Sequence, residues 1–251
     1  MLDIVYEDKY ILAVHKPAGI PSQTASISQS DVVSMTEDYL RGDQRTSKRP
    51  FVGMINRLDQ PVEGIVLMAR DAKTAARLAE QLRGGMIEKR YCACVVPDSE
   101  GYGGTEPVSV SGTVGKSPII LTDHIYHDKK LNYSSIVPAG HKDAKTAKLE
   151  CMLAKIRDVA AGDNEVRIAL ADIHLITGRH HQIRVQMSHA GLPLLGDRKY
   201  GTEYVQNVSK LLKVSEVALC ACQLTFTHPV TNDIINLRVK PQGMWYSLFQ
   251  N

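Results

Sequence analysis

Residues 51–69 read FVGMINRLDQPVEGIVLMA, and in this stretch a short polar segment separates two apolar runs. The runs, Phe51 to Ile55 and Gly64 to Ala69, have the length and composition of buried strands. The polar segment between them, Asn56 to Pro61, is therefore expected to form a tight loop at a sheet edge. It carries a carboxylate, Asp59, in the kind of rigid position that often holds catalytic groups. Taken alone, an Asp at such a place is more often a turn former.

The sequence on both sides of this stretch alternates strand-like runs with a few helices. Cap and stop residues predict helices over residues 31–41 and 71–84. Residues 147–156 and 165–176 predict a hairpin of two long strands with its turn at 161–164. Shorter strands are expected at residues 4–6, 10–14, 89–96, 217–226 and 234–239, and a further helix after Arg179. This order, without an internal repeat, predicts an α+β fold around a largely antiparallel sheet.

The composition is that of an ordinary globular protein. Of the 251 residues, 43% are hydrophobic and 23% are charged, which excludes disorder, collagen-like structure and coiled coil for the whole chain. We expect a single domain over residues 1–251. Apolar runs fall far short of the roughly 20 residues of a membrane helix, and no secretory signal opens the sequence. A cytoplasmic protein is therefore expected. The net charge of +3 fits polyanionic partners and an ordinary solubility charge equally well.

Several motifs of nucleotide-dependent and hydrolytic enzymes are absent. The sequence has no phosphate-binding Gly-x-x-x-x-Gly-Lys-Ser/Thr loop and no dinucleotide fingerprint after the first strand. It also lacks a Gly-x-Ser-x-Gly elbow and the zinc deaminase signature. We therefore expect no cofactor.

Neither the cysteines nor the histidines predict a metal site. Two Cys-x-Cys pairs lack the spacing of common zinc modules and are expected to be small buried side chains: Cys92, Cys94, Cys220 and Cys222. Four histidines lie in one part of the chain: His174, His180, His181 and His189. Neighbouring side chains on a helix point about 100° apart, so these residues are poorly placed to share an ion. A His-based metallohydrolase is kept only as an alternative.

Four segments, taken in order, carry a family resemblance. They are Lys16-Pro17-Ala18-Gly19-Ile20, Asn56-Arg57-Leu58-Asp59-Gln60-Pro61-Val62-Glu63-Gly64, Lys89-Arg90-Tyr91 and Thr177-Gly178-Arg179-His180-His181-Gln182-Ile183-Arg184. Further matches follow in His189 to Pro193, Gly196-Asp197, Tyr200-Gly201 and Phe226 to Pro229. Together these segments resemble the motifs of the RluA-type pseudouridine synthases. The resemblance extends from about Ile4 to Pro241, and it implies a curved, mainly antiparallel mixed sheet flanked by helices.

The resemblance implies a cofactor-free and metal-free enzyme that isomerises uridine to pseudouridine in structured RNA, either rRNA or tRNA, bound in a central cleft. Asp59 stands at the position of the family's catalytic aspartate. Tyr91 stands where a tyrosine stacks on the target base, and Arg184 where an arginine pairs with the aspartate. Arg57 matches an arginine that helps to displace the target nucleotide. We also expect Lys16, Arg179 and His181 to bind the substrate.

Physical chemistry supports these roles. Cleavage of the glycosidic bond and reattachment of the base through C5 require an ionised carboxylate. An arginine within about 4–6 Å lowers the pKa of a carboxyl group by roughly 1–3 units. An aromatic ring can hold the detached base, since stacking is worth about 1–3 kcal/mol per base. A guanidinium can fill the place of a base flipped out of the RNA helix. Whether the carboxylate attacks C1′ or C6, or the base leaves by elimination, stays open.

The sequence departs from the family pattern at three positions. Asn56 stands where His is common, His15 where Asn is usual, and Glu63 where Ser is frequent. We expect Glu63 to face outward or to pair with a nearby Arg, because an inward carboxylate would disfavour ionisation of Asp59. The chain is expected to be a standalone catalytic domain without an S4-type RNA-binding domain. Substrate selection would then use the loop 97–118 and the basic stretch 41–49, although the latter fits a solvated loop equally well.

A catalytically inactive RNA-binding relative is the second alternative. The presence of Asp59, Tyr91 and Arg184 argues against it, since RNA binding alone needs no carboxylate in the groove. No obligate protein partner and no membrane partner are indicated, and a monomer is the default.

Overall fold

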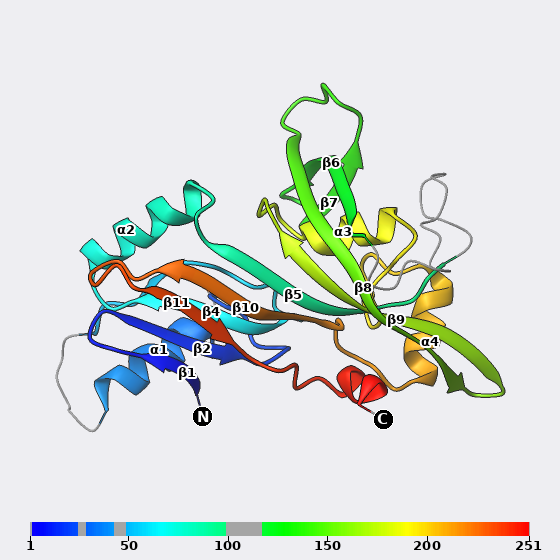
Figure 1. Cartoon of the computed structure of the whole chain (residues 1–251), viewed down its shortest axis with the longest axis horizontal. Coiled ribbons are helices and arrows are strands. Elements are labelled where there is room, and N and C mark those ends of the chain that lie inside the picture. The colour runs from blue at the N-terminus through cyan, green and yellow to red at the C-terminus, as the bar shows by residue number, and fades with distance from the viewer. Residues whose placement is uncertain (1, 25–28, 43–48, 99–116, 251) are drawn as a thin grey trace. The chain divides into compact units, whose positions relative to one another are not determined.

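The computed structural model describes residues 2–24, 29–42, 49–98 and 117–250, which form two compact units (Figure 1). The first unit comprises Met1–Lys89 and Cys220–Gln242, and the second comprises Arg90–Leu219 and Gly243–Asn251. Among the described residues, no helix combines the length and the apolar character needed to span a membrane. Most of the loop 97–118 and of the basic stretch 41–49 lies outside the described residues, so their predicted role in substrate selection stays a prediction.

The first unit is a mainly antiparallel sheet with two fully buried central strands. Its strands are β1 (Asp3–Glu7), β2 (Ile11–Lys16), β3 (Gly53–Met54), β4 (Glu63–Ala69), β10 (Leu219–Thr227) and β11 (Ile234–Arg238). The order is β1-β2-β4-β10, with β3 paired to β4 and β11 paired to β10. Strands β4 and β10 run parallel, and the other pairs are antiparallel. Every residue of β2 and β4 is buried, as expected for continuous apolar runs.

Two capped helices complete the first unit: α1 (Val32–Arg41) and α2 (Ala72–Arg83). The Asp31 side chain accepts a hydrogen bond from the backbone of α1, and Asp71 does the same for α2, which satisfies amides that have no partner within the helix. Leu78 of α2 is fully buried and packs into the sheet core. The core also contains Ile11, Ile65, Leu67, Phe226 and Leu237.

The second unit is an antiparallel sheet with a long hairpin. Its elements are β5 (Glu88–Val95), β6 (Ile119–Asp128), β7 (Tyr133–Val137), β8 (Lys145–Ala161), β9 (Asn164–Leu175), α3 (Gln182–His189), α4 (Glu203–Leu211) and the 3₁₀ helix η1 (Met244–Phe249). The strand order is β5-β9-β8-β6-β7. Gly162 takes a φ of +64° at the turn of the β8–β9 hairpin, a conformation that glycine adopts without a steric cost. Helix α3 packs against β6 and β7 (Figure 1).

These elements confirm the predicted α+β fold with its mainly antiparallel sheet. The helices at 31–41 and 71–84 and the hairpin around 161–164 lie where the sequence predicts them. The buried strand predicted at Phe51 to Ile55 is wrong in extent, because only Gly53 and Met54 pair with β4 and Phe51 is exposed. Strands β6 and β7 and helix α4 were not anticipated. The single domain over 1–251 and its central cleft stay predictions.

Candidate active site

Asp59 lies half-buried in the loop between β3 and β4, and hydrogen bonds hold the loop backbone on both sides of it. The Gly19 amide donates to the Gln60 carbonyl at 2.8 Å, and the Gln60 side-chain amide donates back to the Gly19 carbonyl at 3.0 Å. The Val62 amide donates to the Asp59 carbonyl at 3.0 Å and closes a turn. The Asp59 carboxylate therefore projects from a backbone that is fixed before any substrate binds.

A buried serine fixes the same loop one residue earlier. The Ser22 hydroxyl donates to the Leu58 carbonyl at 2.7 Å and accepts from the Leu58 amide at 3.0 Å. Leu58 is buried, whereas the neighbouring Arg57 is exposed. An exposed arginine beside Asp59 suits the predicted contact with a displaced nucleotide, which stays a prediction.

The departure at Asn56 has a structural explanation. The Asn56 side chain donates to the Ile65 carbonyl at 2.9 Å and accepts from the Leu67 amide at 2.8 Å. It thus satisfies two backbone groups of β4, in the way that a strand residue would. Asn56 therefore supports the loop by tying it to the buried strand.

Lys16, which is expected from the sequence to bind the substrate, is buried beside the Asp59 loop. Its side chain is fully buried, and the ammonium donates to the carbonyls of Pro17, Ile20 and Gln60 at 2.9, 2.7 and 3.1 Å. Burial lowers the pKa of Lys16 to about 8, although Asp59 and Glu63 favour its charged form. The ammonium lies inside the unit, and the predicted binding of substrate by Lys16 stays a prediction. Its charge holds the loop that carries Asp59.

Glu63 does not face outward, which is one of the two arrangements expected for it from the sequence. Its side chain is buried at the start of β4, and one carboxylate oxygen accepts a hydrogen bond from the Gln242 amide at 2.9 Å. The same oxygen lies 3.5 Å from Nε2 of His15. The outward arrangement is excluded because β10 and β2 flank β4 at this point and enclose the side chain.

In the second unit, Tyr91 lies on β5 directly opposite Ile173 of β9. Its side chain is largely buried, with 8% exposed. Next to it, the Arg90 guanidinium lies 3.7 Å from the Asp172 carboxylate across the same strand pair. A ring held in a strand has few accessible rotamers, which suits a rigid stacking surface.

Arg184 lies on α3 and is buried in an ion pair that the sequence did not predict. Its Nε and Nη2 donate to the two carboxylate oxygens of Asp197 at 2.7 and 2.8 Å. The guanidinium carbon lies 5.1 Å from the centre of the Tyr200 ring. Asp197 in turn accepts hydrogen bonds from the Lys199 and Tyr200 amides at 2.9 and 3.1 Å. Carboxylate, ring and turn together fix the plane of the guanidinium.

The sequence contained a signal for Asp197. The pair Gly196-Asp197 belongs to the segments that carry the resemblance, but no role was assigned to it. Gly196 has a φ of +78°, and a side chain there would collide with the Glu216 carbonyl. The turn therefore requires glycine at this position, and it places the carboxylate of the next residue, Asp197, against Arg184.

His181 begins α3 in a left-handed conformation with a φ of +53°, and its ring belongs to a stack of histidines. The ring centres of His180 and His181 are 3.7 Å apart, and those of His127 and His180 are 3.8 Å apart. Burial and the Arg184 charge lower the pKa of His181 to about 2. Since the Ser134 amide donates to the Tyr200 hydroxyl at 2.9 Å, that hydroxyl is oriented to donate to Nδ1 of the neutral His181 ring at 2.7 Å.

Arg179 precedes this helix, and its Nε donates to the Thr146 carbonyl at 2.9 Å. The second unit therefore brings Arg184, His181, Tyr200 and Asp197 together around the start of α3. The pairing of Arg184 with Asp59, and the substrate-binding roles of Arg179 and His181, stay predictions.

The described residues include one group with the geometry to hold a metal ion: His15, Glu63 and Cys220 of the first unit. In the histidine cluster considered from the sequence, the ring planes of His180 and His181 are tilted by 34° to each other.

Comparison with known proteins identifies close relatives. A family model described as RNA pseudouridylate synthase matches residues 10–189. A protein of Yersinia pestis named tRNA pseudouridine synthase C is 30% identical over 253 residues, which cover 99% of this chain and 90% of the relative. Ribosomal large subunit pseudouridine synthase C of Buchnera aphidicola is 27% identical over 250 residues, which cover 99% of this chain and 70% of that relative.

Two solved human structures have the same fold. RNA pseudouridylate synthase domain containing 1 and domain containing 4 each superpose with a TM-score of 0.70, at 17% and 21% sequence identity. The match to the first covers 96% of this chain and 84% of the human chain. The match to the second covers 98% and 91%, respectively. This similarity confirms the predicted fold class.

Proposed function

Since the chain belongs to the RNA pseudouridylate synthase family and is an enzyme that converts uridine to pseudouridine in RNA, we propose that Asp59, Tyr91 and Arg184 carry out this conversion. The observation that supports the assignment best is the family match over residues 10–189, which includes all three residues. Uridine and pseudouridine are isomers. The N1–C1′ bond breaks, a C5–C1′ bond forms, the C5 proton leaves and N1 gains a proton, so no oxidant, reductant or second substrate is consumed.

Asp59 is proposed to act as the carboxylate that starts the reaction, either as a nucleophile or by stabilising positive charge on the sugar. Its support is the fixed loop backbone and the buried cation of Lys16 beside it. Because the attraction between the two charges is mutual, Lys16 favours the ionised carboxylate. A preorganised charge of this kind needs no rearrangement when the bond breaks.

Tyr91 is proposed to stack on the target uracil and to keep the detached base in place while it turns. Its position in a paired strand supports this role. A ring that is fixed in advance loses little conformational entropy when a base stacks on it. Stacking of this kind contributes about 1–3 kcal/mol, which suffices to retain the base between bond cleavage and reattachment.

Arg184 is proposed to pair with Asp59 and to hold it ionised. A guanidinium has five N–H donors, and the pair with Asp197 uses two of them. Asp197 is therefore a positioning residue that fixes the plane in which Arg184 can meet a second carboxylate. Arg57 is proposed to occupy the space of the flipped nucleotide, and Arg179 and His181 to contact the RNA.

The substrate is proposed to be a structured RNA, and tRNA is the first to test. The relative from Yersinia pestis is matched over 90% of its length and is named for tRNA, whereas the rRNA-named relative is matched over 70%. We further propose that residues 1–251 act together as one catalytic domain in the cytoplasm, as a monomer and without a cofactor.

A tritium-release assay tests the assignment. Purified protein is incubated with tRNA and rRNA transcripts that carry tritium at C5 of uridine, and the label released measures turnover. Asp59→Asn is expected to abolish release while RNA binding remains. Asp38→Asn, a matched change of an exposed carboxylate on α1, is expected to behave like the unmodified protein. Full turnover in Asp59→Asn would remove Asp59 from the mechanism. Tight RNA binding without release by the unmodified protein would favour the inactive relative.

A further inference from the structure

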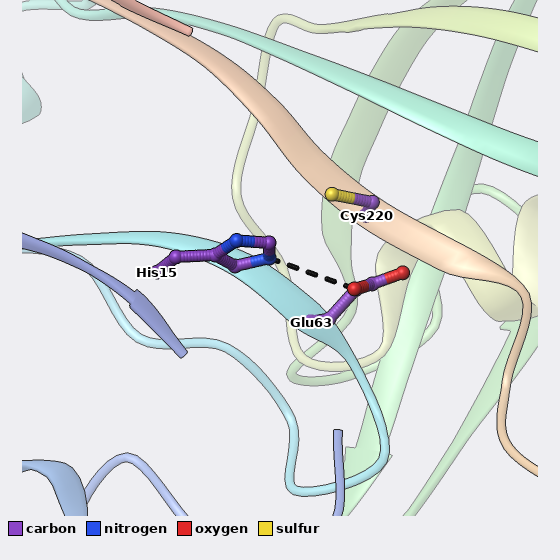
Figure 2. A group of neighbouring side chains, drawn as sticks. All are labelled: His15, Glu63 and Cys220. Atoms are coloured by element: carbon purple, nitrogen blue, oxygen red, sulfur yellow. Dashed lines mark ion pairs between the residues drawn. The ribbon is translucent and has the colours of Figure 1, made fainter. Parts of the chain in front are cut away.

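Three polar side chains from three strands of the first unit meet in its interior: His15 of β2, Glu63 of β4 and Cys220 of β10 (Figure 2). All three residues are buried. Their potential ligand atoms, an imidazole nitrogen, a carboxylate oxygen and a sulfur, lie within 4.8 Å of one another. A cluster of this composition inside an apolar sheet requires an explanation, because a buried charge is costly unless it is compensated.

Strand register brings the three residues together. Cys220 pairs directly with Glu63 in the parallel β4–β10 ladder. His15 pairs with Ile65, which lies two residues after Glu63 and therefore on the same face of β4. Gly64 allows the close approach, since its φ is +124° and a side chain there would collide with the backbone of Ala221. The cluster is thus built into the sheet.

The distance between His15 and Glu63 fits a shared metal ion better than a hydrogen bond. Nε2 of His15 is buried and has no hydrogen-bond partner, and it lies 3.5 Å from the Glu63 oxygen. This separation exceeds the usual 2.7–3.2 Å of an N–H···O bond. Two ligands at about 2.0–2.3 Å from a tetrahedral zinc lie roughly 3.3–3.7 Å apart. The unpartnered nitrogen points toward the glutamate oxygen, as Figure 2 shows.

The surroundings of the cluster resemble the outer shell of a metal site. Nδ1, the other ring nitrogen of His15, lies 3.6 Å from an Asp3 carboxylate oxygen, which is an electrostatic contact and too long for a direct hydrogen bond. A carboxylate behind a ligating histidine orients the ring and raises its basicity. The Gln242 amide donates to the Glu63 carboxylate at 2.9 Å and orients it in the same way. A thiolate and a carboxylate together balance the charge of a divalent ion.

We propose that His15, Glu63 and Cys220 bind a zinc ion that ties β2, β4 and β10 together next to the Asp59 loop. Zinc accepts nitrogen, oxygen and sulfur ligands in one site, and this mixed set matches no purely hard or purely soft cation. The ion is assigned a structural role, because its three ligands come from three different strands. The sequence predicts no metal site, and the histidines that lie close together in it are a different group. The ligands come from three strands far apart in the chain, so no motif spacing reveals them.

Metal analysis of the whole protein tests the proposal. The protein is saturated with zinc, freed of excess ion by gel filtration and measured by elemental mass spectrometry. One zinc ion per chain is expected. Cobalt substitution adds a spectroscopic readout, because a cysteine ligand produces a sulfur-to-cobalt charge-transfer band. Cys220→Ser should abolish this band, and Cys222→Ser, two residues along the same strand, should retain it. Asp3→Asn, which changes the carboxylate behind His15 and none of the three ligands, is expected to weaken the affinity for zinc by roughly 10- to 100-fold.

Two results would overturn the proposal. The first is a zinc-saturated protein that elutes without metal, which would leave a buried imidazole–carboxylate pair instead. The second is equal loss of cobalt binding in Cys220→Ser and Cys222→Ser. Both variants are compared by circular dichroism, so that unfolding is not mistaken for lost ligation. Neither result bears on the proposed function, because metal content and tritium release are measured independently.

Discussion

Replacement of Asp197 by Asn should cost the protein both stability and turnover, because it leaves a buried guanidinium without its counter-ion. Asp197 is 2% exposed and Arg184 is 5% exposed. Removal of one partner of a buried ion pair costs about 3–5 kcal/mol. The amide of Asn can still accept from the Lys199 or Tyr200 backbone, so we expect the low end, about 3 kcal/mol.

The chain supplies a matched control for this prediction. Arg167 and Asp158 form a pair with the same two-point geometry, at 2.9 and 3.1 Å, but both side chains are about half exposed. An exposed pair contributes about 0.2–1 kcal/mol. Asp158→Asn should therefore lower the free energy of unfolding much less than Asp197→Asn does, and it should leave turnover unchanged.

Urea unfolding and tritium release measure the two effects. A double variant, Arg184→Met with Asp197→Leu, removes both charges and should recover most of the lost stability, since apolar replacement of a whole buried pair is often neutral or better. It should nevertheless be inactive, because the proposed partner of Asp59 is gone. Equal unfolding free energies for Asp197→Asn and Asp158→Asn would refute the reasoning. So would a double variant that still turns over substrate.

Three further predictions follow from single contacts. As pH falls below about 6.5, the unfolded chain binds a proton at His181 that the folded protein, with a pKa of about 2, does not. The unfolding free energy should therefore drop by less than about 1.4 kcal/mol per pH unit from this group, because solvent screens a partly exposed ring. Urea unfolding should find this component missing in His181→Asn. Ser22→Ala should cost about 1–3 kcal/mol, because the buried amide and carbonyl of Leu58 lose their partner, and kcat should fall more than KM rises. Gly64→Ala should lower the free energy of unfolding by about 2–4 kcal/mol, because backbone strain and the collision with Ala221 add up. Gly140→Ala is the control, since Gly140 has a φ of +89° and open space around it. In the same thermal melts it should show the effect of the strain alone.

Most of the fold could be predicted from local pattern. Capped helices such as α2 and the β8–β9 hairpin carry their signals within a short stretch of sequence, so their positions follow from periodicity and turn residues. Strand β3 was overestimated because Phe51 looks like a core residue but is exposed. Strands β6 and β7 carry too many polar residues on their half-buried faces to have a clear alternating pattern.

The roles of individual charged residues could be predicted less well than the fold. Lys16 follows a buried strand and precedes a Pro-Ala-Gly loop, and from the sequence it is indistinguishable from an exposed cation. It is buried because the carbonyls of Pro17, Ile20 and Gln60 converge on its ammonium, and Gln60 lies in a segment that only the folded chain brings near. With three carbonyl acceptors, the Lys16 ammonium stabilises the loop.

His15 and Glu63 are also charged or polar residues whose role could not be predicted. Both depart from the family pattern, but the sequence does not show that they are neighbours. Strands β2 and β4 are antiparallel neighbours, and their register sets His15 diagonal to Glu63 on one face. A shift of the register by one residue would send the two side chains to opposite faces, and nothing in either strand alone fixes that register. Two unusual residues that become neighbours only through the sheet are best explained together. Their coupling can be measured, because the effects of His15→Asn and Glu63→Ser on stability should be non-additive in a double-mutant cycle.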